Sequence, residues 1–131
     1  MQSFSIRFLG FGLGVLMLFH GVDKIMNGTQ FIENMLNAYH LPPYIDVKYL
    51  SYGVYVGEVV APLLLIIGQL MRISGAIIAF NMLVAIILVH QSHLLTLGEH
   101  GAWAIEVPMF YLIAGLAIAF SKPQVKKLET L

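Results

Sequence analysis

The chain alternates between long apolar runs and shorter polar segments. Four runs meet the requirement of about 20 mainly apolar residues for a helix that crosses a bilayer. They cover about residues 4–26, 49–68, 73–95 and 102–120. Strands of a membrane barrel need only about 9–11 residues and alternate in polarity, so helices fit these runs better. The pattern predicts an all-α fold: a transmembrane four-helix bundle, formed by a single four-span domain over residues 1–131.

The connection between the first and second runs has a helical pattern of its own. Phe31, Met35 and Ala38 recur at helical spacing, which puts them on one side of a helix. Pro42 and Pro43 follow, and proline ends a helix because it lacks a backbone N–H and clashes with the preceding turn. We predict a short amphipathic segment between helices 1 and 2 that lies on the outer surface of the bilayer.

Composition supports a membrane protein and excludes several other classes. Of the 131 residues, 59% are hydrophobic and 11% are charged, against about 45–50% and about 25% in soluble domains. The net charge is zero and no basic patch interleaves with aromatic residues, so a nucleic-acid partner is excluded. Because the chain has no cysteine, it cannot form disulfides, ligate iron–sulfur clusters or carry out thiol chemistry by itself.

Basic residues are divided unequally between the two ends of the predicted spans. One side carries Arg7, Arg72, Lys122, Lys126 and Lys127, and the other carries Lys24 and Lys48. Cytoplasmic segments are enriched in lysine and arginine, so both termini and the turn at residues 69–72 are predicted to be cytoplasmic. Arg7 ahead of an apolar run also resembles a signal peptide, but no small-residue cleavage site follows it.

Glu58 interrupts the second apolar run, where an acidic side chain costs about 2.5–3.5 kcal/mol. With a rise of about 1.5 Å per residue, Glu58 and Asn81 lie at similar depth near the bilayer midplane. His20 and Glu106 lie about one helical turn closer to the outer face. His90 is about half a turn around the helix from Asn81, which removes it from the inward face. We predict that Glu58 faces the interior, within reach of a polar group on the first or third helix.

Three interpretations of this polar set are open. A metal site has acceptable ligand types but no HExxH or Glu-x-x-His motif, so no metal is predicted. A structural interpretation pairs Lys24 with Asp23 or Glu106 in a salt bridge. It also sets Arg7 and Arg72 against lipid phosphates. A redox interpretation uses a carboxylate near a histidine to relay protons, or to hydrogen-bond a quinone carbonyl between apolar walls.

Several features recur in the order and spacing of a known family. They are an early Arg7; His20-Gly21-x-x-Lys24; the Phe31 region and Pro42; Glu58; Leu64-Leu65-x-x-Gly68 with Arg72; and Glu106 at the start of the fourth run. On these features, which cover nearly the whole chain, the sequence resembles the DoxX family of small four-helix integral membrane proteins. The resemblance implies a four-helix bundle and a membrane oxidoreductase component, since the family is named after a subunit of a thiosulfate:quinone oxidoreductase.

The resemblance and the polar set together suggest the integral membrane subunit of a redox system that binds quinone in the outer half of the bilayer. Glu58 and His20 are the expected catalytic residues. The residues expected to bind the cofactor are Lys24, Tyr55, Asn81 and Glu106. The expected setting is the bacterial inner membrane, with a partner protein that supplies electrons and a homo-oligomer as a further possibility. Whether the chain is itself part of an enzyme, a quinone-linked oxidoreductase, stays open.

The alternative is a non-enzymatic membrane module that binds a partner protein or a lipid. It is motivated by the lack of a nucleophile, a phosphate loop or a cofactor fingerprint in the sequence. In this interpretation the polar residues only lock the bundle. Transport ranks third, because four helices form a narrow bundle and no matching pair of discontinuous helices is evident.

Overall fold

The fold, a computed structural model that describes residues 1–124, is built from helices, and this part of the chain contains no strand. A lone bridge joins Leu97 and Trp103. The helices are α1 (Phe4–Asn27), α2 (Gln30–Asn37), α3 (Val47–Ser51), α4 (Gly53–Tyr55), α5 (Ala61–Ile67), α6 (Met71–Val89) and α7 (Glu106–Phe120). A π-helical turn, η1 (Val56–Val60), connects α4 to α5, and two short 3-10 turns, η2 (Gln91–His93) and η3 (Glu99–Gly101), follow α6.

Three helical stretches within residues 1–124 are long and apolar enough to cross a membrane: Phe4–Asn27, Val47–Ile67 and Met71–Val89. The first two agree with the predicted spans at about 4–26 and 49–68, so the predicted helical content is confirmed there. The fourth apolar helix, α7, has 15 residues. At about 1.5 Å per residue it is roughly 22 Å long, shorter than a hydrocarbon core of about 30 Å.

The predicted spans 73–95 and 102–120 were wrong at the ends that face each other. Residues 90–105 form an irregular connection in which Leu95 and Leu97 are exposed despite their apolar side chains. Left-handed backbone at His100 (φ 59°) and Gly101 (φ 79°) prevents a continuous helix. The indole N–H of Trp103 donates to the carbonyl of Leu94 over 2.8 Å and closes the connection on itself. Hydropathy reports side-chain polarity and does not detect such backbone breaks.

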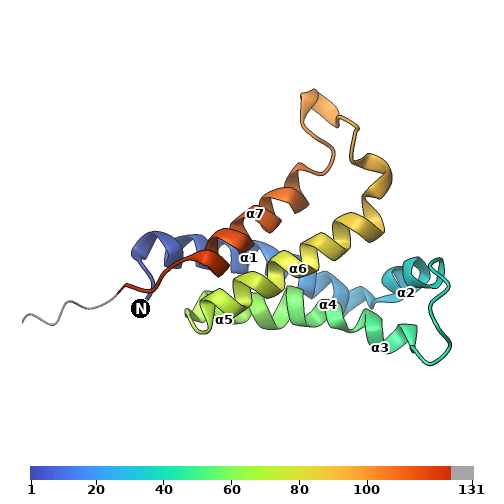
Figure 1. The fold of residues 1–131 in the computed structure, drawn as a ribbon, viewed down its shortest axis with the longest axis horizontal. Coiled ribbons are helices and arrows are strands. Elements are labelled where there is room, and N and C mark those ends of the chain that lie inside the picture. Colours follow the sequence, from blue (N-terminus) through green and yellow to red (C-terminus); the bar gives the residue numbers. More distant parts are fainter. Residues whose placement is uncertain (125–131) are drawn as a thin grey trace, which may run out of the picture.

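The helices pack as two neighbouring pairs, α1 with α5 and α6 with α7 (Figure 1). The N-terminus, the turn between α5 and α6 and the end of α7 lie at one end of the molecule, which we call the basic end. The connection 90–105 and α2 lie at the other, which we call the loop end. The α6–α7 pair diverges from α1 toward the loop end (Figure 1). The η1 turn contacts both α1 and α6, so this segment bridges the two pairs.

The core lies between the helices and consists mainly of aliphatic side chains. Its buried members are Leu13, Met17, Ala61, Leu65, Met71, Ile78, Met82, Tyr111, Ala114 and Ile118. Glycines allow the closest approach of α6 and α7. A Cβ at Gly75 would lie 2.7 Å from the carbonyl oxygen of Gly115, and one at Gly115 would lie 2.8 Å from that of Gly75. Membrane helices commonly pack through small residues in this way, because van der Waals contact drives their association.

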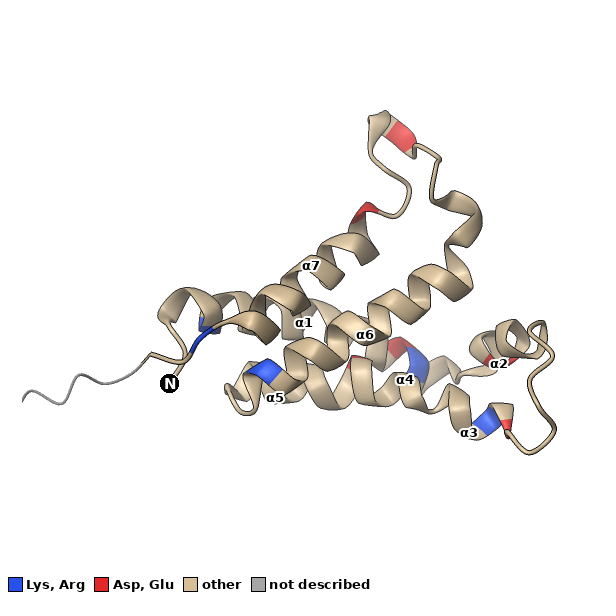
Figure 2. Cartoon of the chain, viewed as in Figure 1, with Lys and Arg blue, Asp and Glu red and all other residues tan. Residues whose placement is uncertain are grey.

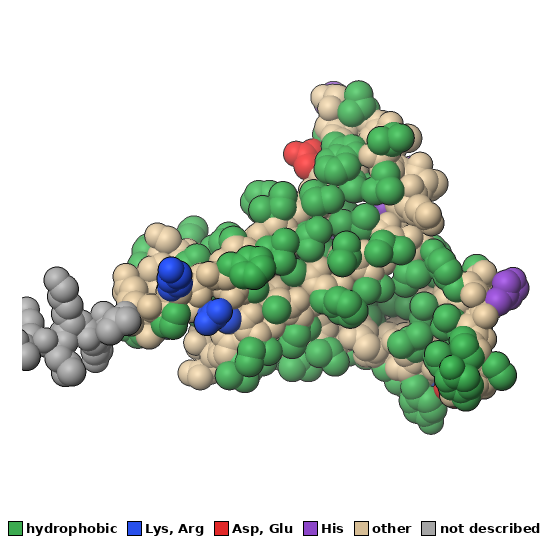
Figure 3. Space-filling view, viewed as in Figure 1, with side chains coloured by type: hydrophobic (Ala, Val, Ile, Leu, Met, Phe, Trp, Pro, Cys, Tyr) green, Lys and Arg blue, Asp and Glu red, His purple; other side chains and the backbone are tan. Residues whose placement is uncertain are grey.

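The predicted helix in the connection after α1 is confirmed as α2, which buries Leu36, whereas Phe31 and Ala38 of the predicted apolar face are exposed. Its location on the outer surface of the bilayer stays a prediction. The hydroxyls of Thr29 and Ser51, both buried, lie 3.0 Å apart and hold the start of α2 against the end of α3. Apolar side chains cover much of the visible face of the long helices (Figure 3). A surface of that kind suits helices surrounded by lipid.

Charged residues are sparse on the long helices (Figure 2). Arg7, near the start of α1, and Arg72, in the first turn of α6, lie at the basic end. Most acidic residues lie toward the loop end (Figure 2). Lys126 and Lys127, which contributed to the predicted orientation, lie outside the described residues. The cytoplasmic location of the termini therefore stays a prediction.

Candidate functional site

Glu58 lies in the π-helical turn η1 and is 5% exposed. The turn has a local cause in the sequence. Pro62 has no N–H to donate to the carbonyl of Glu58, four residues earlier. The N–H of Ala61 instead donates to the carbonyl of Val56, five residues earlier. Single π turns inside α-helices occur frequently at functional sites.

Helix α1 approaches the backbone of Glu58 at Gly21. A Cβ at Gly21 would overlap the carbonyl oxygen of Glu58 and come within 2.8 Å of the Val59 side chain. Only glycine leaves room for this contact. Gly21 therefore sets α1 close to η1, and its neighbour Lys24, three residues further along α1, reaches the same region.

The buried carboxylate of Glu58 has a partner on each of two other helices. Lys24 Nζ donates to Glu58 Oε2 over 3.1 Å, and Asn81 Nδ2 donates to Glu58 Oε1 over 3.3 Å. The prediction that Glu58 faces the interior and reaches a polar group on the first or third helix is confirmed. Lys24, Glu58 and Asn81, which we call the Glu58 cluster, join α1, η1 and α6.

Two further residues shape this cluster. The Tyr55 hydroxyl donates to the carbonyl oxygen of Lys24 over 2.9 Å, which anchors the end of α1 to α4. A Cβ at Gly57 would lie 2.5 Å from Asn81 Cγ. Gly57 thus makes room for the Asn81 amide, and Tyr55 holds the Lys24 backbone in place.

The burial of the cluster favours a direct, hydrogen-bonded ion pair between Lys24 and Glu58. The Glu58 side chain is 7% exposed and that of Lys24 is 20% exposed. Removing two charges from water costs several kcal/mol each, and good geometry with added hydrogen bonds is needed to offset that cost. The amide of Asn81 supplies such a bond to the second carboxylate oxygen. Lys24 keeps part of its side chain accessible, so one member of the pair is partly exposed.

The structural interpretation paired Lys24 with Asp23 or Glu106, and the ion pair between Lys24 and Glu58 shows that these two pairings were wrong. Asp23 instead accepts a hydrogen bond from Asn27 Nδ2 over 2.7 Å, one turn further along α1. Glu106 is exposed in the first turn of α7. The partner of Lys24 is Glu58, because Gly21 turns this face of α1 toward η1.

His20 and Glu106 do not join the Glu58 cluster. His20 is exposed and packs edge-to-face on Tyr111, with ring centroids 5.8 Å apart. Glu106 and Tyr111 border a separate cavity of about 270 Å³ between α1 and α7, whose other walls are apolar. Depth along a helix predicted a common upper layer for His20 and Glu106. It did not predict that both belong to the α1–α7 seam, because depth contains no information about direction around the helix.

No group of three or more His, Asp or Glu side chains within residues 1–124 comes close enough together to hold a metal ion.

Sequence reasoning missed the contributions of Gly21 and Pro62 to the site. The signal for Pro62 was present, since proline four residues after a buried carboxylate frees the carbonyl of that same residue.

The Glu58 cluster combines an ammonium donor, an amide donor and a carboxylate acceptor. Lys24 can donate to an oxygen of a ligand that reaches its exposed part, and Glu58 can accept or return a proton. The cluster adjoins the apolar core, whose buried members include Ala61, Ile78 and Met82. Few polar groups in an apolar setting are typical of small-molecule sites.

Comparison with known families gives one match. The family model DoxX matches residues 6–91, more than half of the chain. The matched region contains Lys24, Glu58 and Asn81, whereas Glu106 and α7 lie outside it. Comparisons with curated proteins and with solved structures gave no match. The apolar spans and the family match together identify an integral membrane protein, and the chain belongs to the DoxX family.

Proposed function

We propose that this DoxX protein is a subunit of a membrane redox system and that the Glu58 cluster binds the head group of a quinone. The observation that carries the proposal is the ion pair between Lys24 and Glu58, buried on the Glu58 side and partly accessible on the Lys24 side. Intramembrane ionisable residues are costly and are usually retained for function.

The residues of the cluster suit a quinone head group. Lys24 and Asn81 are donors for carbonyl oxygens, and Glu58 is an acceptor for a hydroxyl. A bound quinone would supply two-electron, two-proton chemistry. Lys24 would orient a head-group oxygen, Glu58 would hold or release a proton at Oε2, and Asn81 would keep the carboxylate in place. Since the chain has no cysteine, we assign electron transfer to a partner protein.

His20 and Glu106 are not included in this site. Among the described residues, His20 forms its aromatic contact with Tyr111, and Glu106 borders the α1–α7 cavity. We therefore centre the proposal on Lys24, Glu58 and Asn81, and we expect His20 to have a smaller effect on quinone binding.

A second candidate is a non-enzymatic module in which the cluster only locks the helices. The observation that favours it is that each Glu58 oxygen already has a partner within the chain. A locked pair of this kind fixes the relative positions of α1, η1 and α6 without any ligand. If the cluster has only this role, variants of it would lower the thermal stability of the protein and would not change its affinity for quinone.

The test compares quinone binding and thermal stability in the same variants. Purified protein in detergent is titrated with a short-chain benzoquinone analogue by calorimetry. Glu58→Gln should weaken binding by roughly 10–100-fold, since a hydrogen bond to a charged group contributes about 1.5–3 kcal/mol. The exposed carboxylate Glu99 gives the control, Glu99→Gln, which should leave affinity unchanged. Unchanged affinity in Glu58→Gln, together with a lower melting temperature, would instead support the structural role.

A further inference from the structure

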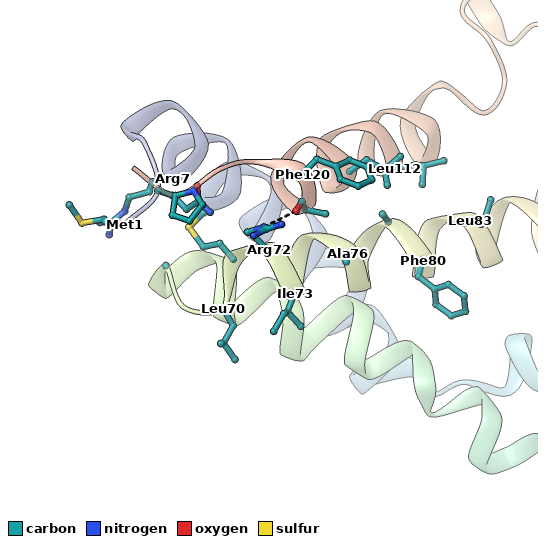
Figure 4. A pocket seen from close by; sticks show the side chains of 17 residues that line it. Met1, Arg7, Leu70, Arg72, Ile73, Ala76, Phe80, Leu83, Leu112 and Phe120 are labelled. Atoms are coloured by element: carbon teal, nitrogen blue, oxygen red, sulfur yellow. Dashed lines mark hydrogen bonds between the residues drawn. The ribbon is translucent and has the colours of Figure 1, made fainter. Parts of the chain in front are cut away.

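An apolar groove runs along α6 and α7 and opens at the basic end of the molecule (Figure 4). Its volume is about 1060 Å³, at the upper limit of the roughly 300–1,000 Å³ typical of small-molecule sites. Its walls include Ile73, Ala76, Phe80, Leu83, Leu112 and Leu116. The walls suit a hydrocarbon chain, because they present almost only aliphatic and aromatic surface.

Two arginines border this groove, Arg7 from α1 and Arg72 from the first turn of α6 (Figure 4). Arg72 Nε donates to the Ala119 carbonyl over 3.0 Å, which fixes the guanidinium at the end of α7. A guanidinium has five N–H donors, so this bond uses one of them. Arg7 lies over Gly68, where a Cβ would come within 3.3 Å of Arg7 Nη2. The turn after α5 thus leaves room for Arg7 beside the groove.

Among residues 1–124, no acidic side chain lies in the groove beside these cations. Within residues 1–124 the sole ion pair joins Lys24 to Glu58, and no Asp or Glu lines the groove. Two arginines beside an apolar wall are complementary to a molecule with an anionic head and a hydrocarbon tail. Arginine binds phosphate through two parallel hydrogen bonds, which favours a phosphate head group.

We propose that this groove binds an anionic phospholipid of the surrounding membrane. The phosphate contacts Arg7 and Arg72, and an acyl chain lies along the α6–α7 wall. The site is separate from the Glu58 cluster, since Asn81 points to Glu58 and does not line the groove. Lipid binding at the groove and quinone binding at the Glu58 cluster can therefore be tested independently of each other.

The experiment is native mass spectrometry of the purified full chain with phosphatidylglycerol and phosphatidylcholine of identical acyl chains. We expect phosphatidylglycerol to bind in preference. Arg7→Gln and Arg72→Gln should each weaken that binding about fivefold, because one arginine near an anionic lipid contributes about 1 kcal/mol. Lys48→Gln, which removes a cation at the loop end, should leave binding unchanged. Equal binding of the two lipids, or an unchanged preference in the double arginine variant, would overturn the proposal.

A second pair of variants separates the groove from surface charge. Ala76→Phe fills the groove without altering either arginine, and should weaken phosphatidylglycerol binding. Ala117→Phe adds the same side chain at an exposed position of α7 that does not line the groove, and should have no effect. Inorganic phosphate should not displace the lipid. Equal effects of the two phenylalanines, or displacement by inorganic phosphate, would contradict a phospholipid site. If an arginine variant unfolds in a thermal scan, the two phenylalanine variants decide the outcome.

Discussion

Gly21 of α1 lies directly against the backbone carbonyl of Glu58, at the turn where Pro62 has removed the usual hydrogen-bond donor. The contact leaves no space for a Cβ. It brings α1 close enough for Lys24 to reach the Glu58 carboxylate. The ion pair therefore depends on a glycine and a proline as well as on the charged residues themselves.

Gly21→Ala should destabilise the protein by about 1–3 kcal/mol, the usual cost of adding a methyl group to a tightly packed site. The measurement is thermal or denaturant unfolding in detergent. Gly12→Ala is the matched control, because nothing lies within 4 Å of a Cβ at that position of the same helix. If both variants unfold alike, the close contact of α1 with η1 is wrong.

Lys24→Met should be strongly destabilising, by about 3–5 kcal/mol, because it leaves the buried Glu58 carboxylate without its cation. Combining it with Glu58→Gln should recover part of that loss, with a coupling of at least about 1 kcal/mol in a double-mutant cycle. Asp23→Asn, at an exposed carboxylate on the same helix, should change stability by less than about 0.5 kcal/mol. Additive effects of Lys24→Met and Glu58→Gln would show that the pair does not interact.

His20→Ala should weaken quinone binding by less than about threefold, because the His20 ring contacts Tyr111 and not the Glu58 cluster. The calorimetric titration used for Glu58→Gln measures this directly. A loss as large as that of Glu58→Gln would move the binding site toward the α1–α7 seam.

The orientation of the chain can be measured by single-cysteine labelling, since the natural sequence has no cysteine. Gln69→Cys at the α5–α6 turn and Ser92→Cys in the connection after α6 are both exposed. In intact cells, a membrane-impermeant maleimide should label Ser92→Cys and should leave Gln69→Cys unlabelled until the membrane is opened. The reverse pattern would place the termini outside.

The sequence predicted the first two spans from the length of the apolar runs, and the interior position of Glu58 from the cost of a carboxylate in lipid. A fixed rise per residue put Glu58 level with Asn81, and the two side chains are hydrogen-bonded. The same arithmetic failed for His20 and Glu106. Residues at one depth can face different neighbours, and the close contact of Gly21 with Glu58 brings this face of α1 against η1.

The connection between α6 and α7 was the least predictable part of the fold. Its leucines continue the apolar pattern of α6, while the left-handed backbone at His100 and the Trp103 hydrogen bond depend on local contacts. Hydropathy likewise could not predict the groove beside Arg7 and Arg72, because these two arginines belong to different helices and lie 65 positions apart in the sequence.

Photolabelling with an azido-quinone, followed by peptide mapping, tests the proposed redox site most directly. Labelled residues should fall around the Glu58 cluster, at the end of α1, in η1 or in the middle of α6, and an excess of unlabelled quinone should suppress them. Glu58→Gln should reduce this labelling and Glu99→Gln should not. Labelling confined to the groove of α6 and α7 at the basic end, or labelling equally strong in Glu58→Gln, would contradict a quinone site at Lys24 and Glu58.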